Sequence, residues 1–156
     1  MKVTTLLEQN KDVRHWVANL NKGRRHMMTG LTGSAKTLLL AAVFRQVQQP
    51  MVVVCDQLFR AQQLVDDLQN VVAPDSVLLF PFEEVLAAEM ATSSPEFRAQ
   101  RIQALNALMT GEPRIIVTAV AGVRHFLPAP ATWQTAHITI AVGVDLDLEA
   151  TVAQLT

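Results

Sequence analysis

The apolar residues of this chain form short continuous runs that alternate with longer segments of helical periodicity. A continuous apolar run of about four to eight residues, bounded by Gly or Pro, is typical of a strand buried on both faces of a parallel sheet. Strands that alternate with helical patterns predict an α/β fold, with a parallel sheet flanked by helices. The segments expected as strands are Met27–Met28, Met51–Cys55, Val77–Phe80 and Arg114–Thr118.

The segments between these strands carry helical signals. The sequence Ser93-Ser94-Pro95-Glu96 predicts a helix start, because it combines an S-x-x-E capping box with proline in the first turn. Gly111 is expected to end that helix. The expected helices are Leu6–Leu20, Leu38–Val47, Gln57–Leu68 and a helix that runs from the capping box to Met109.

Two residues at the end of the second strand are candidates for chemistry. Asp56 follows an apolar strand, as does the carboxylate that holds Mg²⁺ in an NTPase, but an Asp directly before a helix is also favoured as its N-cap. We favour the N-cap. Cys55 is expected to be an ordinary buried thiol, since no cation close in sequence would activate it.

The stretch from Gly30 to Thr37 resembles a phosphate-binding loop. The pattern G-x-x-x-x-G-K-[ST] is matched except at its second glycine, which is Ala35. In such a loop, backbone N–H groups surround the phosphates, and glycine is used where the backbone must approach a ligand closely. A Cβ at this position takes room that the phosphates need, so we expect a degenerate loop that binds no nucleotide. The residues of this candidate site are Gly30, Gly33, Ser34, Ala35, Lys36 and Thr37.

Composition excludes several classes of protein. The chain has 156 residues, of which 50% are hydrophobic and only 17% charged, and its net charge is −1. A charge near zero makes no case for nucleic-acid binding. A single cysteine excludes an internal disulfide and a cysteine-rich zinc site, and no other metal-ligand spacing is present. Without a membrane-spanning run or a signal peptide, we expect a soluble cytoplasmic domain.

A domain boundary is expected at the proline-dense segment Leu127–Ala131. Residues 1–128 would form the α/β domain and residues 129–156 the start of a second, truncated domain. In the latter, His137–Ala141 alternates like a strand, and the acidic segment Asp145–Glu149 is typical of a helix start. We therefore expect the chain to be a piece of a longer protein.

Three stretches resemble the N-terminal, UvrB-like module of the bacterial transcription-repair coupling factors (Mfd). Thr29–Thr37 is similar to the UvrB phosphate loop with its last glycine replaced, and Pro50–Leu68 resembles the following helicase-type segment. Phe80 to Leu108, with Phe80-Pro-Phe-Glu-Glu and Ser94-Pro-Glu-Phe-Arg, is the most specific match. The resemblance covers nearly the whole chain and implies a P-loop NTPase/helicase-like fold similar to UvrB domain 1.

The resemblance also implies a function. The chain would be a non-catalytic scaffold that helps to recruit UvrA, and with it nucleotide excision repair, to a stalled RNA polymerase. UvrA would bind mainly the domain beginning near Trp133, while RNA polymerase and DNA would bind other parts of the parent protein. ATP and Mg²⁺ would serve a separate DNA-translocating motor module, so this chain would hold no cofactor, metal or catalytic residue.

Two departures from UvrB support a scaffold. One is Ala35, and the other is the absence of tyrosine, since UvrB inserts a tyrosine-rich hairpin after its third strand. The alternative is an active P-loop NTPase or helicase fragment that tolerates Ala35 and binds ATP and DNA.

Overall fold

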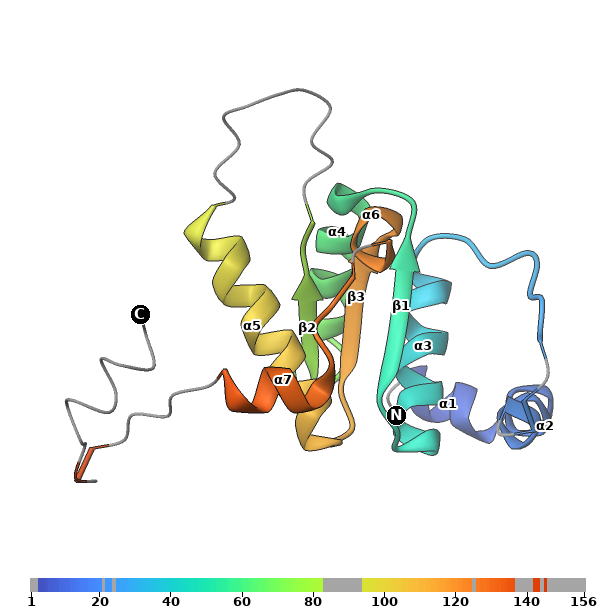
Figure 1. Ribbon diagram of the computed structural model, residues 1–156. Helices are drawn as coiled ribbons and strands as arrows, with labels where there is room; N and C mark the ends of the chain where they lie inside the picture. Colours follow the sequence, from blue (N-terminus) through green and yellow to red (C-terminus); the bar gives the residue numbers. More distant parts are fainter. Residues whose placement is uncertain are drawn as a thin grey trace. The chain divides into compact units, whose positions relative to one another are not determined.

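A computed structural model of the chain describes residues 3–20, 22–23, 25–82, 94–124, 126–136, 142–143 and 145. The chain divides into two compact units, residues 1–125 and 126–156. The first unit holds a parallel three-stranded sheet in the order β1-β3-β2 (Figure 1). Its strands are β1 (Met51–Cys55), β2 (Val77–Phe80) and β3 (Ile115–Ala119). The predicted α/β fold with a parallel sheet flanked by helices is therefore confirmed.

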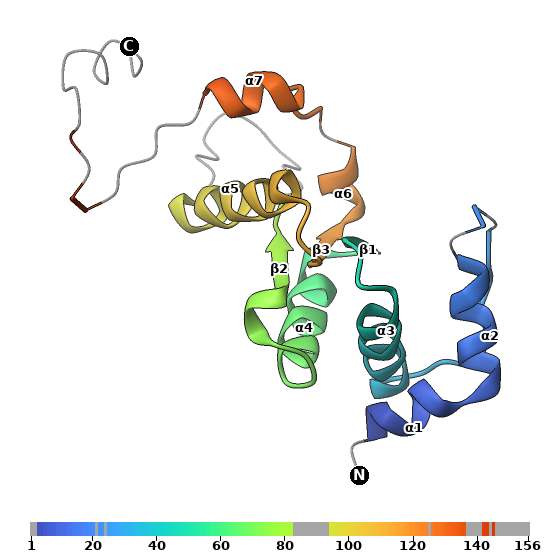
Figure 2. The ribbon, with the colours of Figure 1, turned by 90° about the horizontal axis from the view of Figure 1, so that it is seen from below.

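Helices cover both faces of this sheet. On one face lie α3 (Ser34–Val47) and α4 (Leu58–Gln69), and on the other lies α5 (Pro95–Thr110) (Figure 2). The short helix α6 (Val120–Val123) follows β3 directly, and a 3-10 turn (Pro74–Ser76) leads into β2. This arrangement places the start of α3 and the start of α4 near the carboxyl end of β1.

The core is centred on β3, which is buried along its whole length. Towards α3 and α4, Ile115 and Val117 pack against a cluster of apolar side chains, and towards α5, Ile116 packs against Phe80 and Ala104. The cluster on the α3/α4 side also contains Ala41, Phe44, Ala61, Val65, Leu68 and Val77. Full burial of a Val, Leu or Ile side chain contributes roughly 1.5–3 kcal/mol to the free energy of unfolding. The packing of β3 against the helices on both faces of the sheet therefore holds the unit together.

The expected strand at Met27–Met28 is wrong. Residues 25–29 form no strand, and the Met27 side chain is 89% exposed. Two unbranched apolar residues next to Arg25 and His26 bury little area, whereas strands usually need about five or six residues. The described sheet therefore has three strands, and no strand leads into the Gly30–Thr37 loop.

The prediction that β1 is buried on both faces is also wrong. Its side chains alternate between half-buried and exposed, with Val52 58% and Val54 48% exposed. Met51, Val53 and Cys55 pack towards α3 and α4, whereas Val52 and Val54 point to the opposite face, where α5 packs against β2. By contrast, β2 and β3 lie where they were expected, within one residue.

The expected leading helix Leu6–Leu20 is broken into two helices. α1 (Val3–Gln9) ends at Asn10, and α2 (Lys11–Leu20) begins after it. The Asn10 side-chain oxygen accepts hydrogen bonds from the backbone N–H groups of Asp12, at 2.8 Å, and Val13, at 3.3 Å. Asn10 is therefore an N-cap inside a continuous helical pattern, and a side chain that competes with the helix backbone in this way favours a new start.

The start of α5 is where the sequence predicts it, but its cap is one residue later than the S-x-x-E register. Ser94 is the N-cap, and its hydroxyl accepts a hydrogen bond from the Glu96 N–H at 3.2 Å. Gly111 ends the helix with a left-handed φ of 69°. The Ser94 hydroxyl also donates to the Glu96 carboxylate, and this contact lowers the pKa of that exposed carboxyl.

The second unit contains α7 (Pro130–Thr135), which begins within the proline-dense segment. The expected strand His137–Ala141 and most of the acidic segment Asp145–Glu149 lie outside the described residues, as does the acidic stretch with Glu83, Glu84 and Glu89. The boundary between residues 128 and 129 stays a prediction.

Gly122 is predicted to be intolerant of any side chain. A Cβ at this position would overlap Thr118 Oγ1 and lie 3.3 Å from the Phe80 ring. Thr118 cannot swing away freely, because its buried hydroxyl donates to the Phe80 carbonyl at 2.8 Å. Gly122→Ala should therefore destabilise the fold by about 1–3 kcal/mol in urea unfolding.

The matched control is Val123→Ala, a truncation in the same short helix at a side chain that is 58% exposed. It should change the free energy of unfolding by less than about 0.5 kcal/mol. Combining Gly122→Ala with Thr118→Ala removes the overlapping hydroxyl, so the two losses should be non-additive. Equal effects of Gly122→Ala and Val123→Ala would contradict the close packing of α6 on β3.

Candidate functional site

The Gly-rich segment forms a loop that closes on its own backbone. Gly30 and Gly33 have positive φ angles of 82° and 52°, and Gly33 is the N-cap of α3 without a side-chain capping bond. The Ala35 N–H donates to the Thr32 carbonyl at 3.2 Å, and the Lys36 N–H donates to the Gly33 carbonyl at 3.3 Å. Two of the N–H groups that would face a phosphate are thus engaged within the turn.

The six residues of the predicted loop differ in exposure. Gly30, Gly33, Ser34, Ala35 and Lys36 are exposed, whereas Thr37 is 5% exposed. Gly33, Lys36 and Thr37 line a groove of about 880 Å³, and Gly30, Ser34 and Ala35 do not. The structure therefore brings only half of the predicted residues to a common cavity.

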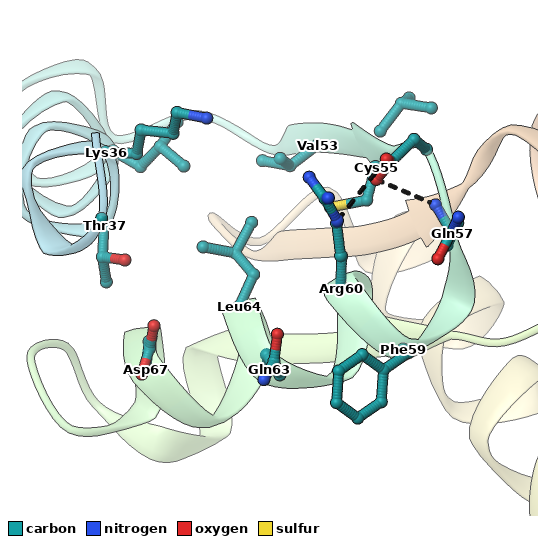
Figure 3. Close-up of a pocket in the computed structure, with 14 residues that line it drawn as sticks. Lys36, Thr37, Val53, Cys55, Gln57, Phe59, Arg60, Gln63, Leu64 and Asp67 are labelled. Atoms are coloured by element: carbon teal, nitrogen blue, oxygen red, sulfur yellow. Dashed lines mark hydrogen bonds and ion pairs between the residues drawn. The ribbon is translucent and has the colours of Figure 1, made fainter. Parts of the chain in front are cut away.

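This groove lies between α3, the carboxyl end of β1 and one face of α4 (Figure 3). Lys36 points from α3 towards β1, and Arg60 rises from α4 on the opposite side. Leu40, Val53 and Leu64 give the groove an apolar lining. The polar side chains contributed by the β1–α4 connection and α4 are Asp56, Gln57, Arg60, Gln63 and Asp67.

Asp56 is not the N-cap of the following helix, so this prediction is wrong by one position. The N-cap is Gln57, which makes no side-chain capping bond. Asp56 instead accepts a hydrogen bond from the Gln57 N–H at 3.1 Å and pairs with Arg60 at 3.5 Å (Figure 3). Arg60 lies one helical turn further on, and an exposed pair at this spacing stabilises only weakly, by about 0.3–0.5 kcal/mol.

Sequence reasoning missed Arg60, Gln63 and Asp67 as residues that line the groove. The spacing from Asp56 to Arg60 is the one available signal, since residues four apart on a helix are neighbours. Gln63 and Asp67 continue this face of α4 at intervals of three and four residues. Which helix lies opposite them depends on the tertiary fold, and the sequence gives no local sign of it.

The described part of the chain contains no group of side chains arranged to bind a metal ion. Among those residues, no three His, Cys, Asp or Glu side chains are grouped as a metal site would require. Thr118, near the carboxyl end of β3, is buried, and its hydroxyl donates a hydrogen bond to the Phe80 carbonyl. Within the same described ranges, no helix is both long and apolar enough to cross a membrane.

Cys55 is half-buried at the end of β1, inside the groove. Burial raises the pKa of its thiol, and the neighbouring Asp56 carboxylate raises it further. The positive charges of Lys36 and Arg60 oppose this shift without cancelling it. The thiol is therefore protonated at neutral pH, in agreement with the expectation of an unactivated cysteine.

The raised pKa of Cys55 predicts slow alkylation. At pH 8, iodoacetamide should react more slowly with the folded chain than with the same chain in urea, because the folded state holds less thiolate. Stability linked to this thiol is full below its unfolded pKa and declines as the pH rises through the raised folded value. The rate of alkylation against pH, followed by mass spectrometry, measures the shift.

Two variants of opposite sign test its cause. Asp56→Asn removes a charge that raises the pKa of Cys55 and should speed the reaction. Arg60→Gln removes a charge that lowers this pKa and should slow it. If both variants changed the rate in the same direction, solvent access rather than charge would control the thiol.

Comparison with known proteins places relatives of this chain among the bacterial transcription-repair-coupling factors. No protein-family model matches the chain. It is 32% identical over 154 residues to the transcription-repair-coupling factor of Bacillus subtilis, a match that covers 98% of this chain and 13% of that protein. The transcription-repair-coupling factors of Staphylococcus aureus strains bovine RF122 / ET3-1 and USA300 are each 28% identical over 123 residues, 79% of this chain and 10% of theirs. The predicted resemblance is thereby confirmed, and this chain is homologous over nearly its whole length to a small part of the bacterial transcription-repair-coupling factors.

Proposed function

We propose that this chain is a non-catalytic scaffold segment of a transcription-repair-coupling factor. The observation that carries the proposal is the 32% identity over 98% of the chain to a protein of that name. The chain spans 13% of the length of this relative, so the parent's activity would reside largely in other segments. In this proposal the parent is a cytoplasmic, ATP-dependent DNA translocase with a separate motor module that holds ATP and Mg²⁺.

The geometry of the Gly30–Thr37 loop supports a scaffold without nucleotide. A phosphate loop presents free N–H groups at a helix N-terminus, but the Ala35 and Lys36 N–H groups donate to carbonyls of the same turn. No described strand precedes the loop to fix its position against the sheet. Binding phosphates would require these backbone bonds to break and the loop to be reorganised, in addition to accommodating the Ala35 side chain.

The partner of the scaffold would be UvrA, bound mainly through the domain that begins near Trp133. Recruitment of UvrA would bring nucleotide excision repair to a stalled RNA polymerase, which other parts of the parent would contact together with DNA. The chain divides at this point into a second compact unit, Phe126–Thr156, which fits the start of a separate binding domain.

An active P-loop NTPase fragment is the second candidate. The observation in its favour is that Lys36 and Thr37, the residues that would meet phosphates and Mg²⁺, both line an open groove. The groove offers Asp56 and Asp67 as carboxylates. Nucleotide titration separates the two candidates directly.

Fluorescent Mg²⁺-ATP analogues should bind this chain with a Kd weaker than about 1 mM, equivalent to about −4 kcal/mol. Binding at micromolar concentration in fluorescence anisotropy would reject the scaffold reading of the loop. Lys36→Ala serves as the control, since residual weak binding that survives it does not use the loop.

Ala35→Gly restores the phosphate-loop pattern and tests whether the alanine alone disables it. We expect no ATPase activity in this variant, because the substitution leaves the backbone hydrogen bonds of the loop in place and cleavage of ATP also needs a positioned metal ion and attacking water. Phosphate release above the wild-type background would show that the remaining machinery is present in the chain and would favour the NTPase reading.

A pull-down with UvrA tests the partner. The longer parent segment, with the complete domain that begins near Trp133, should retain UvrA, while residues 1–156 retain it weakly or not at all. Retention of UvrA by residues 1–127 as strong as by the longer segment would place the binding surface in the α/β unit instead.

A further inference from the structure

Strand β2 lies at the edge of the sheet opposite β1, and one side of its backbone faces away from β3. Among the described strands it pairs only with β3. Figure 2 shows β2 at the end of the sheet, with α4 beside one face and α5 beside the other. The outward edge of β2 is thus flanked by two helices without a described strand between them.

Backbone bonds at the two ends of β2 show which residues face outwards. The Phe80 carbonyl accepts from Thr118 of β3 at 2.8 Å and so points towards β3. The Val77 carbonyl accepts from the Gln69 side-chain amide of α4 at 3.4 Å and so points away from β3. Because alternate residues of a strand direct their backbone groups to opposite neighbours, the N–H and C=O of Leu79 face outwards with Val77.

A cavity of about 440 Å³ opens beside this outward edge. It is lined by Leu79 of β2, Gln100 of α5 and several side chains of α4, among them Phe59, Val65, Asp66 and Gln69. The Gln100 side-chain oxygen is buried and has no hydrogen-bond partner among the described residues. A buried acceptor of this kind is costly to leave unpaired, so the site lacks a donor at this point.

We propose that the outer edge of β2 binds an extended peptide that carries a basic residue, as an added strand of the sheet. The Leu79 N–H and C=O supply the main-chain hydrogen bonds, as in other peptides that extend a sheet edge. A donor of the peptide pairs with the Gln100 oxygen, and its apolar side chain packs against Phe59, which is 65% exposed. This interaction is distinct from UvrA recruitment, and its cavity shares Phe59 and Gln63 with the lining of the groove at Lys36.

The charge of the cavity lining determines which kind of peptide is favoured at this edge. Asp66 is the single charged residue of the cavity lining, so a Lys or Arg side chain of the peptide is favoured there. A second copy of this chain is disfavoured as the added strand, because its β2, Val77–Phe80, carries no basic residue that could pair with Asp66. A basic peptide gains this ion pair.

The probe is an acetylated, fluorescein-labelled peptide of sequence Val-Lys-Val-Lys-Val, titrated against the whole chain by fluorescence anisotropy. At saturating peptide, hydrogen exchange of the Leu79 amide should slow by at least about tenfold, since a new strand protects it. A peptide with an N-methylated central valine keeps the side chains but loses a backbone donor. Its binding should be lost.

Matched variants test the side-chain contacts. Asp66→Asn should weaken binding by about two- to fivefold. Asp67→Asn, the neighbouring carboxylate, lines the other groove and should leave the affinity within about twofold. Gln100→Met keeps a similar shape without the acceptor and should weaken binding by about two- to tenfold.

Four results would overturn the proposal. One is equal binding of the N-methylated peptide, which would mean that main-chain pairing plays no part. The second is the absence of binding by the probe up to about 1 mM, and the third is an equal loss of affinity in Asp66→Asn and Asp67→Asn. The fourth is a Leu79 amide whose exchange slows with protein concentration alone, which would assign the edge to self-association.

Discussion

The parallel pairing of β3 with both of its neighbours is the interaction on which the rest of the unit depends. β3 is the one described strand with partners on both sides, and all five of its residues are buried. Its Ile115 and Val117 hold α3 and α4, while Ile116 holds α5 through Phe80 and Ala104. Since the crossovers through α4 and α5 lead to β2 and β3, the positions of these two helices follow from that pairing.

The groove at Lys36 is a consequence of that ladder. Parallel strands bring their carboxyl ends to one edge, where open α/β sheets bind ligands. β1 places Cys55 and Asp56 there, and α4 then brings Arg60 back onto Asp56. The loop before α3 lies at the same edge, but its Ala35 and Lys36 N–H groups donate hydrogen bonds to carbonyls of the same turn. The groove therefore lies where open α/β sheets bind ligands, while two N–H groups of the adjoining loop are engaged within their own turn.

The strands of the sheet could be located from the sequence, whereas segments whose conformation depends on tertiary contacts or on a local side-chain bond were predicted wrongly. Strands β1, β2 and β3 combine β-branched residues with flanking Gly or Pro, so local pattern and packing agree. Met27–Met28 has only the apolar character, and it forms no strand. Asn10 split a helix because its side chain competes for the backbone, a cap signal masked by the continuous apolar spacing around it.

The candidate site was predictable in part for the same reason. The G-x-x-x-x-A-K-T pattern is local, and three of its residues, Gly33, Lys36 and Thr37, line the groove. Arg60 and Asp67 come from a helix whose approach is set by the burial of Ala61, Val65 and Leu68 on its other face. Which polar residues this burial turns towards α3 follows only once the helix is packed.

The two edges of the sheet differ in a way that follows from these helices. At β1, Val52 and Val54 expose an apolar strand face. At β2, glutamine side chains of α4 and α5 flank the strand, and Gln69 already caps one outward carbonyl. Proteins protect sheet edges against indiscriminate pairing, often with charged or polar side chains beside the strand. A glutamine side chain can hydrogen-bond to backbone groups at a sheet edge, because its amide carries donors and an acceptor. Because the side chain is flexible, it can also rotate away when another strand approaches. Glutamine side chains beside the edge therefore make strand pairing selective. An added strand must form hydrogen bonds that replace those of the glutamines, or the complex contains unpaired polar groups.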